Sequence, residues 1–208
     1  MGTRKILVAS TNPGKLAELK VMLDADVEWL SLADFEDIPE VEEDGNTFVE
    51  NACKKAIGYA MAADLWTISD DSGLEIDILE GAPGVKSARF CGHTPEQTDR
   101  VVIDHKNNTK VLKLMKGVPK AERTARFTCC LCLASPAQIL IETEGTLEGR
   151  ITGKRMGDKG FGYDPIFRVP QRKKTVAQLA PEQKNAISHR GNAIRELKPL
   201  LDTLLETV

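Results

Sequence analysis

The sequence predicts an α/β fold, because buried strands and helices alternate from its N-terminus onward. A buried apolar strand over residues 5–10 leads through a loop into a helix, and another strand follows over 27–32. This β-loop-α-β order is typical of α/β proteins. The length of 208 residues and the hydrophobic content of 41% suit one packed unit, residues 1–208, and the spread of helices and strands favours two lobes with a cleft.

The first half of the chain has a signal for each element. Leucines at helical spacing favour a helix that begins near Lys15. Thr47 and Glu50 form a capping box, which indicates the start of a second helix, and alanines recur at helical spacing after it. A strand is expected to end at Ser69, with an acidic turn after it and a further strand through Ile78.

The second half is predicted from turn residues and apolar runs. A helix start at Thr94 and Pro95 predicts a helix that reaches about Met115. Leucines at helical spacing favour a C-terminal helix, which Pro199 is expected to kink or to delay. The other expected elements are a turn over 81–84, two strands within 124–147 joined by a turn at 135–136, and a last short strand over 166–169.

Composition and charge exclude several classes of protein. A net charge of −3 argues against nucleic-acid binding by bulk electrostatics, which needs a basic surface. No apolar run approaches the roughly 18–20 residues that cross a bilayer, and the N-terminus does not look like a signal peptide. The five cysteines lack the paired spacing of a zinc site, and the group at 129–132 is expected to line a buried strand. We therefore expect a cytoplasmic protein.

Two adjacent carboxylates, Asp70 and Asp71, are the most informative residues of the chain. Aspartate is rare in strands and like charges repel, so this pair at a strand end indicates a cation beside it. Mg²⁺ takes such hard oxygen ligands. A second acidic group, Glu42, Glu43 and Asp44, precedes a helix, where the helix dipole alone also explains negative charge. The sequence thus predicts metal-assisted phosphate chemistry, with a solvated turn as the alternative.

The loop between the first strand and the first helix is a candidate phosphate site. Backbone N–H groups at a helix start favour an anion, and a lysine in the loop adds positive charge. Ala9 and Leu16 depart from the pattern of a Walker A loop, so an ordinary capped turn is the alternative. The residues of this loop are Ser10, Thr11, Asn12, Pro13, Gly14 and Lys15.

Two later segments carry aromatic or polar groups. The stretch 160–165 combines glycines with two aromatic rings, which can either stack on a base or pack inside a turn. His189 and Arg190, shortly after Lys184, supply hydrogen-bond donors that suit carbonyl or phosphate oxygens. Exposed surface residues are the alternative explanation for these two side chains.

Taken together and in this order, the motifs resemble the inosine triphosphate pyrophosphatase family, the RdgB-like enzymes that remove deaminated purine nucleotides. The resemblance implies two α/β lobes around an elongated, twisted mixed β-sheet, with the active site in the cleft between them. It also implies a homodimer and Mg²⁺-dependent hydrolysis of ITP, dITP and XTP to the monophosphate and pyrophosphate. The matching segments span nearly the whole chain and are 10–15, 43–56, 70–74, 81–90, 160–167 and 184–191.

The resemblance assigns roles to individual residues. Asp71 is implied as the general base and, with Glu43, as a Mg²⁺ ligand. Donors from Arg190 or His189 aimed at the 6-oxo group of the base would reject adenine, whose amine is itself a donor. The implied contacts to the substrate are Ser10, Thr11, Asn12, Pro13, Gly14, Lys15, Lys55, Ser72, Arg89, Phe161, Gly162, Tyr163, Asp164, Lys184, His189 and Arg190.

Two other functions are compatible with parts of this pattern. The Maf-like nucleotide pyrophosphatases share the fold but act on pyrimidine or methylated nucleotides, and the 160–164 loop with the His189-Arg190 pair favours purines instead. A nucleotide sensor that binds without hydrolysis would not need Asp71 as a base. Mg²⁺-dependent release of pyrophosphate distinguishes an enzyme from a sensor.

Overall fold

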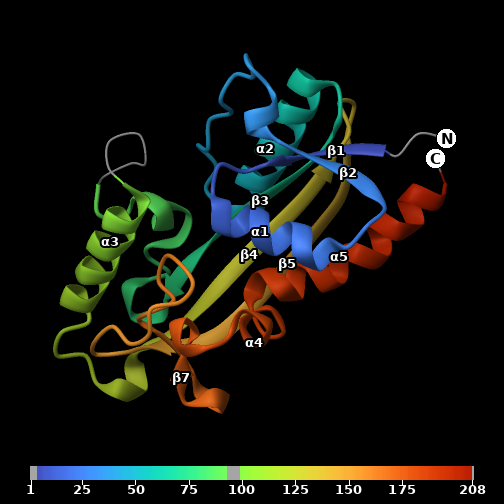
Figure 1. The fold of residues 1–208 in the computed structure, drawn as a ribbon. Helices are drawn as coiled ribbons and strands as arrows, with labels where there is room; N and C mark the ends of the chain where they lie inside the picture. The colour runs from blue at the N-terminus through green and yellow to red at the C-terminus, as the bar shows by residue number, and fades with distance from the viewer. Residues whose placement is uncertain (1–3, 93–98, 208) are drawn as a thin grey trace. The chain divides into compact units, whose positions relative to one another are not determined.

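The structure, a computed structural model, describes residues 4–92 and 99–207, and it contains a seven-stranded sheet with flanking helices (Figure 1). The strands are β1 (Arg4–Ala9), β2 (Val27–Ser31), β3 (Trp66–Ile76), β4 (Thr124–Ala134), β5 (Ile139–Ile151), β6 (Phe167–Val169) and β7 (Lys174–Thr175). The α-helices are α1 (Pro13–Leu23), α2 (Phe48–Ala63), α3 (Arg100–Leu114), α4 (Pro181–Asn185) and α5 (His189–Glu206).

The sheet is mixed, and its strand order is β2-β1-β3-β4-β5-β6-β7. Strand β1 pairs in parallel with both β2 and β3, as the opening β-loop-α-β order requires. At the other end of the order, β5, β6 and β7 pair antiparallel. The predicted α/β class with a mixed sheet is therefore confirmed.

The chain divides into two compact units. Unit 1 comprises residues 1–71, 129–145 and 189–208, and unit 2 comprises 72–128 and 146–188. Strands β3, β4 and β5 contribute residues to both units. The cleft and the single domain over 1–208 stay predictions. Among the described residues, no helix is both long enough and apolar enough to span a membrane.

Unit 1 has its own core on both faces of the sheet. Ile6 and Val8 of β1 pack in a cluster with α1 and α5, which lie side by side in Figure 1. Leu7 and Ala9, which point to the opposite face, pack against Tyr59 of α2. Side chains of a strand alternate between faces, so this apolar run needs helices on both sides of β1. This layering places the starts of α1 and α5 on one face and α2 on the other.

Unit 2 has a separate core beneath α3. Val111 and Met115 belong to a cluster with Phe127 and Phe167, whose ring centroids are 4.3 Å apart. Gly149 of β5 allows this packing, because a Cβ there would lie 2.3 Å from a ring carbon of Phe167. These contacts fix α3 against the strands of the unit.

Most of the expected elements are confirmed with small shifts in their bounds. Helix α1 begins at Pro13, slightly before the predicted start, and β2 and the β4–β5 pair lie where they were expected. Thr47 caps α2: its Oγ1 accepts from the Glu50 N–H at 3.2 Å, and the Glu50 side chain accepts from the Thr47 N–H. The cysteines of β4 are buried, as predicted for thiols that line a strand.

The predicted break after Ser69 is wrong, because β3 continues through the acidic pair to Ile76. Ile78 lies instead in a 3₁₀ helix, Asp77–Leu79. Two carboxylates can be buried in the middle of this strand because ammonium and guanidinium groups from α1, α2 and α5 neutralise them. Propensity along the chain does not reveal partners that lie far away in sequence.

Three further expectations differ in detail. A seventh strand, β7, follows β6, so the strand predicted as the last one is not the last. Helix α5 already begins at His189, so Pro199 does not delay it, and the kink stays a prediction. The predicted helix start at Thr94 lies outside the described residues, whereas α3 ends at Leu114, next to the predicted Met115.

Candidate active site

The start of α1 forms a capped turn in unit 1. The Oδ1 atom of Asn12 accepts from the N–H groups of Gly14 at 3.0 Å and Lys15 at 3.4 Å, and Pro13 occupies the first helical turn. The Asn12 N–H donates to Oγ of Ser10 at 3.2 Å. The Nδ2 atom of Asn12 is buried and has no hydrogen-bond partner within 4–92 and 99–207. The cap is therefore confirmed, and it leaves an amide donor and a helix N-terminus that suit an anion.

Asp70 is the centre of a buried ion-pair network in unit 1. Its Oδ1 lies 2.5 Å from Nζ of Lys15, and its Oδ2 lies 2.7 Å from Nε of Arg190. Cys129 donates to the same Oδ2 at 3.2 Å, and Arg190 also pairs with Glu18 at 2.5 Å. Burial alone would raise the pKa of Asp70, but Arg190 and Lys15 outweigh it and hold that pKa well below its usual value. The positive charge that the sequence predicts beside Asp70 therefore comes from two side chains of the protein, Lys15 and Arg190.

Asp71 has a different environment, although it is the next residue. Asn51 donates to its Oδ2 at 3.2 Å, and Nζ of Lys55 lies 3.7 Å from its Oδ1. The same ammonium lies 3.0 Å from Glu43 and donates to the Asp70 carbonyl at 2.9 Å. Burial is the main cause that raises the pKa of Asp71, and Glu43 adds to it against the opposing charge of Lys55. A carboxylate of this kind is a stronger proton acceptor than an exposed aspartate.

Glu43 and Asp71 form a donor set that fits Mg²⁺. Both carboxylates contact the Lys55 ammonium, so their oxygens already converge on one cationic position. Within the described ranges, no three His, Cys, Asp or Glu side chains gather as a metal site. Two carboxylates match the way Mg²⁺ binds when phosphate oxygens and water complete its shell, rather than a cage made by protein alone. Glu42 is exposed, and Asp44 pairs with Lys54 at the surface.

A second cluster of predicted residues lies in unit 2. Nζ of Lys184 lies 2.8 Å from Oδ2 of Asp164 and 4.3 Å from the ring centroid of Phe161. The same carboxylate oxygen accepts from the Phe161 N–H at 3.1 Å. Lys184 and Asp164 are both buried, whereas Phe161 is half-buried. This aromatic ring and ammonium group suit the face and the carbonyl oxygen of a base.

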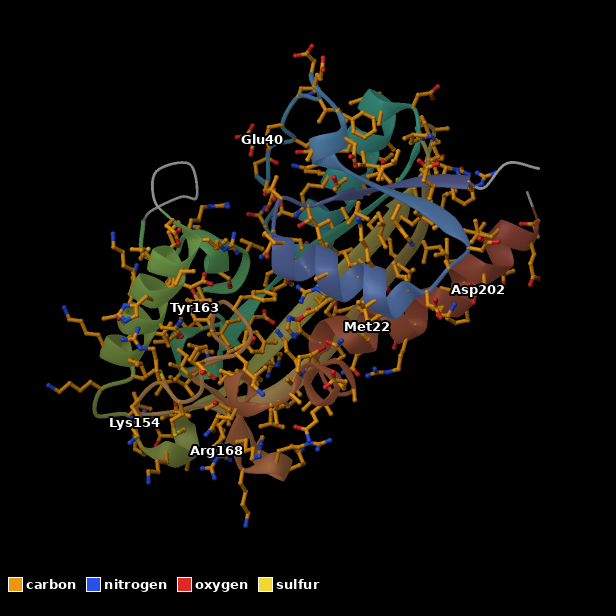
Figure 2. The ribbon with its side chains drawn as sticks, viewed as in Figure 1. Met22, Glu40, Lys154, Tyr163, Arg168 and Asp202 are labelled. Carbon is orange, nitrogen blue, oxygen red and sulfur yellow. The ribbon has the colours of Figure 1, made fainter. Side chains whose placement is uncertain are left out.

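Tyr163, labelled in Figure 2, is a packed ring rather than an open stacking platform. It is 5% exposed and belongs to the core cluster of unit 2. Its hydroxyl donates to the Ser87 carbonyl at 2.8 Å. The packed turn that the sequence allowed for 160–165 is thus confirmed for this ring.

The remaining predicted residues have varied surroundings. Ser72 is half-buried on β3, and Arg89 is exposed at the end of a 3₁₀ helix. His189 and Arg190 are buried at the start of α5, which rules out the surface explanation for both. The predicted residues in unit 1 are Ser10, Thr11, Asn12, Pro13, Gly14, Lys15, Glu43, Lys55, Asp71, His189 and Arg190, and those in unit 2 are Ser72, Arg89, Phe161, Gly162, Tyr163, Asp164 and Lys184. That one nucleotide contacts both groups stays a prediction.

Comparison with known proteins identifies the family. Residues 6–200 match the Ham1 family. The chain belongs to the Ham1 family. This confirms the family that the motifs resemble. Similar proteins include two named dITP/XTP pyrophosphatase. The one from Desulforamulus reducens is 45% identical over 201 residues and 96% of each chain, and the one from Listeria innocua is 44% identical over 205 residues and 98% of each chain.

Solved Ham1 structures have the same fold. The HAM1 protein from Coxiella burnetii gives a TM-score of 0.85 at 38% identity and covers 97% of this chain and 100% of that one. The Staphylococcus aureus Ham1 protein gives a TM-score of 0.84 at 38% identity, covering 96% of this chain and 99% of that one. Both support the α/β assignment.

Three residues that contact the candidate site are missing from the sequence-based prediction: Asn51, Glu18 and Cys129. Asn51 precedes Lys55 by one helical turn, so the spacing places both on one face of α2 and could have identified it. Glu18 contacts Arg190, and Cys129 contacts Asp70, across long stretches of chain. No local pattern marks either of these two residues.

Proposed function

We propose that this Ham1 protein hydrolyses the deaminated purine nucleoside triphosphates ITP, dITP and XTP to the monophosphate and pyrophosphate with Mg²⁺. The relatives named dITP/XTP pyrophosphatase support this reaction. The observation that carries the proposal is the buried Asp71 carboxylate, whose pKa burial raises, held by Asn51 beside Lys55. A binding protein would have no need for such a proton acceptor.

The phosphate chain would be bound by unit 1. The N-terminus of α1 offers backbone N–H groups, and Asn12 offers a buried Nδ2 donor. Lys15 and Lys55 add two ammonium groups beside the acidic pair. These groups would offset the negative charge of the phosphates and orient the triphosphate for in-line attack by water.

Asp71 would accept a proton from the attacking water, and its hydrogen bond from Asn51 fixes the orientation of the carboxylate. Glu43 and Asp71 would hold Mg²⁺, which when bound neutralises phosphate charge and helps to position the reacting groups. Lys55 lies against both carboxylates and limits their repulsion when no substrate is present.

The base would be recognised by buried donors and by the Phe161 ring. The His189 or the Arg190 side chain would donate to the 6-oxo group of hypoxanthine or xanthine, and the Lys184 ammonium beside Phe161 would be a further polar contact for the base. Adenine presents an amine there, so a donor in the site would be left without an acceptor. Arg190 also pairs with Asp70, so the same side chain would link base recognition to the phosphate-binding residues.

Two alternatives lead to other outcomes. A Maf-like specificity would favour dTTP over purine nucleotides, and a sensor would bind nucleotide without turnover. The homodimer and the cytoplasmic location implied by the resemblance stay predictions.

The reaction is tested by identifying its products. We expect purified protein to convert ITP to IMP and pyrophosphate with Mg²⁺, and to lose this activity in EDTA. Chromatography of the nucleotide and an assay for pyrophosphate follow both products. Formation of IDP and inorganic phosphate, or undiminished turnover in EDTA, would contradict the proposal.

A further inference from the structure

Two side chains of α3 hold both backbone polar groups of one glycine in the predicted base-binding loop. Oδ2 of Asp104 accepts from the Gly162 N–H at 2.7 Å. Nδ2 of Asn108 donates to the Gly162 carbonyl at 2.8 Å. Gly162 has φ +61°, a conformation that residues with a side chain rarely adopt. The helix thus replaces the hydrogen bonds that regular structure would give to this backbone.

The two α3 side chains are themselves fixed. Asn108 is 2% exposed, and its Nδ2 also donates to the Asp104 carbonyl one helical turn earlier, at 2.7 Å. Nε of Arg100 lies 3.6 Å from the other oxygen of Asp104. Burial raises the pKa of Asp104, while the Gly162 N–H and Arg100 oppose this. The geometry of this pair is therefore set before any ligand binds.

The composition of α3 also points to a specific role. Asn107 and Asn108 are adjacent in the middle of the helix, where asparagine is a poor helix former. Asn107 accepts from the Cys91 N–H at 2.7 Å and donates to the Ser87 carbonyl at 3.2 Å. The Tyr163 hydroxyl reaches that same carbonyl at 2.8 Å. Helix α3 therefore contacts Gly162 directly. It contacts Tyr163 indirectly, because Asn107 and the Tyr163 hydroxyl donate to the same Ser87 carbonyl.

Phe161, the residue before Gly162, is expected to contact the base together with Lys184. Phe161 lies beneath the Lys184 ammonium, and its N–H donates to Asp164. A rotation of the backbone at Gly162 would move the Phe161 ring relative to the Asp164–Lys184 pair. Contact with the base depends on keeping these groups in one arrangement.

We propose that Asp104 and Asn108 are positioning residues that fix Gly162 and thereby set the affinity of the loop for the purine base. This inference rests on the proposed function, in which Phe161 and Lys184 contact the base. Neither α3 side chain touches the reacting phosphate in this scheme, so both act on binding of the base and not on the chemical step.

The test compares four variants with wild type, with ITP as substrate and inorganic triphosphate as a competitive inhibitor that lacks a base. Asp104→Ala and Asn108→Leu each remove one bond to Gly162, and we expect KM to rise roughly 5- to 100-fold while kcat stays within about threefold. Asp104→Asn keeps an oxygen acceptor, so its KM should return to within about threefold of wild type. Thr109→Ala serves as the matched control, because it removes an exposed hydroxyl that donates to the His105 carbonyl of the same helix.

The inhibition constant of inorganic triphosphate distinguishes a loss of positioning at Gly162 from a general loss of structure. Because its predicted contacts lie in unit 1, its inhibition constant should be unchanged in every folded variant. Unchanged KM in both Asp104→Ala and Asn108→Leu, with active wild type, would overturn this inference alone. A parallel rise of KM and the inhibition constant would also overturn it, because it would indicate a structural role. Wild type that does not hydrolyse ITP would overturn the proposed function and this inference with it.

Discussion

The Asp71→Asn variant is expected to lose about 10²- to 10⁴-fold in kcat, the usual contribution of a general base. Asparagine keeps the shape of the side chain and can still accept from Asn51, but it cannot take a proton from water. Binding of nucleotide should stay within about tenfold of wild type, because the lost function acts in the transition state. Single-turnover kinetics with ITP, together with a binding titration, measure the two effects separately.

The stability of this variant provides the control. Burial raises the pKa of Asp71, so the ionised carboxylate is less favourable in the folded chain than in the unfolded one at neutral pH. A neutral side chain should therefore leave the melting temperature equal or slightly higher. A retained kcat in a well-folded variant would remove Asp71 as the base. A large loss of stability would mean that reduced activity says nothing about proton transfer.

The neighbouring substitution, Asp70→Asn, is expected to lower the free energy of unfolding by about 3–5 kcal/mol. It leaves the buried Arg190 guanidinium and the Lys15 ammonium without the carboxylate that neutralises them. Chemical denaturation followed by circular dichroism measures this loss. Asp44→Asn, which breaks an exposed pair with Lys54, is the matched control and should leave the unfolding midpoint unchanged.

The dependence of folding stability on pH is a second test of the same ion-pair network. The pKa of Asp70 lies well below its usual value because of Arg190 and Lys15. A lowered carboxyl pKa stabilises the folded chain above the unfolded pKa of about 3.9, and this contribution is lost as the pH falls towards the native value. Wild type should therefore lose stability below about pH 4 more steeply than Asp70→Asn. Parallel curves for the two proteins would show that Asp70 is not the centre of the network.

The elements of this fold could be predicted where the pattern is local. The apolar run of β1, the capping box of Thr47 and the alanine spacing of α2 each depend on residues close together in sequence. The acidic pair could not be placed in this way. Asp70 and Asp71 look like a turn because aspartate disfavours strands, and the residues that permit β3 to continue come from α1, α2 and α5.

The residues of the candidate site also fall into two groups: those that a local pattern marks, and those that only contacts between distant parts of the sequence reveal. Lys15 was predicted from the loop pattern and Lys55 from the family resemblance, and the structure brings both to the acidic pair. Asn51 could have been predicted from helical spacing, because it lies one turn before Lys55 in α2. The contacts of Asp104 and Asn108 with the 160–164 loop join residues more than fifty positions apart, so only the packing of α3 reveals them.

Preference for deaminated purines is measured by the release of pyrophosphate from ITP, XTP, GTP, ATP and dTTP. Each nucleotide is supplied at equal concentration with Mg²⁺, and kcat/KM is compared across the set. We expect rapid cleavage of ITP and XTP and much slower cleavage of the other three nucleotides. Equal cleavage of ATP, a preference for dTTP, or binding of every nucleotide without release of pyrophosphate would contradict it.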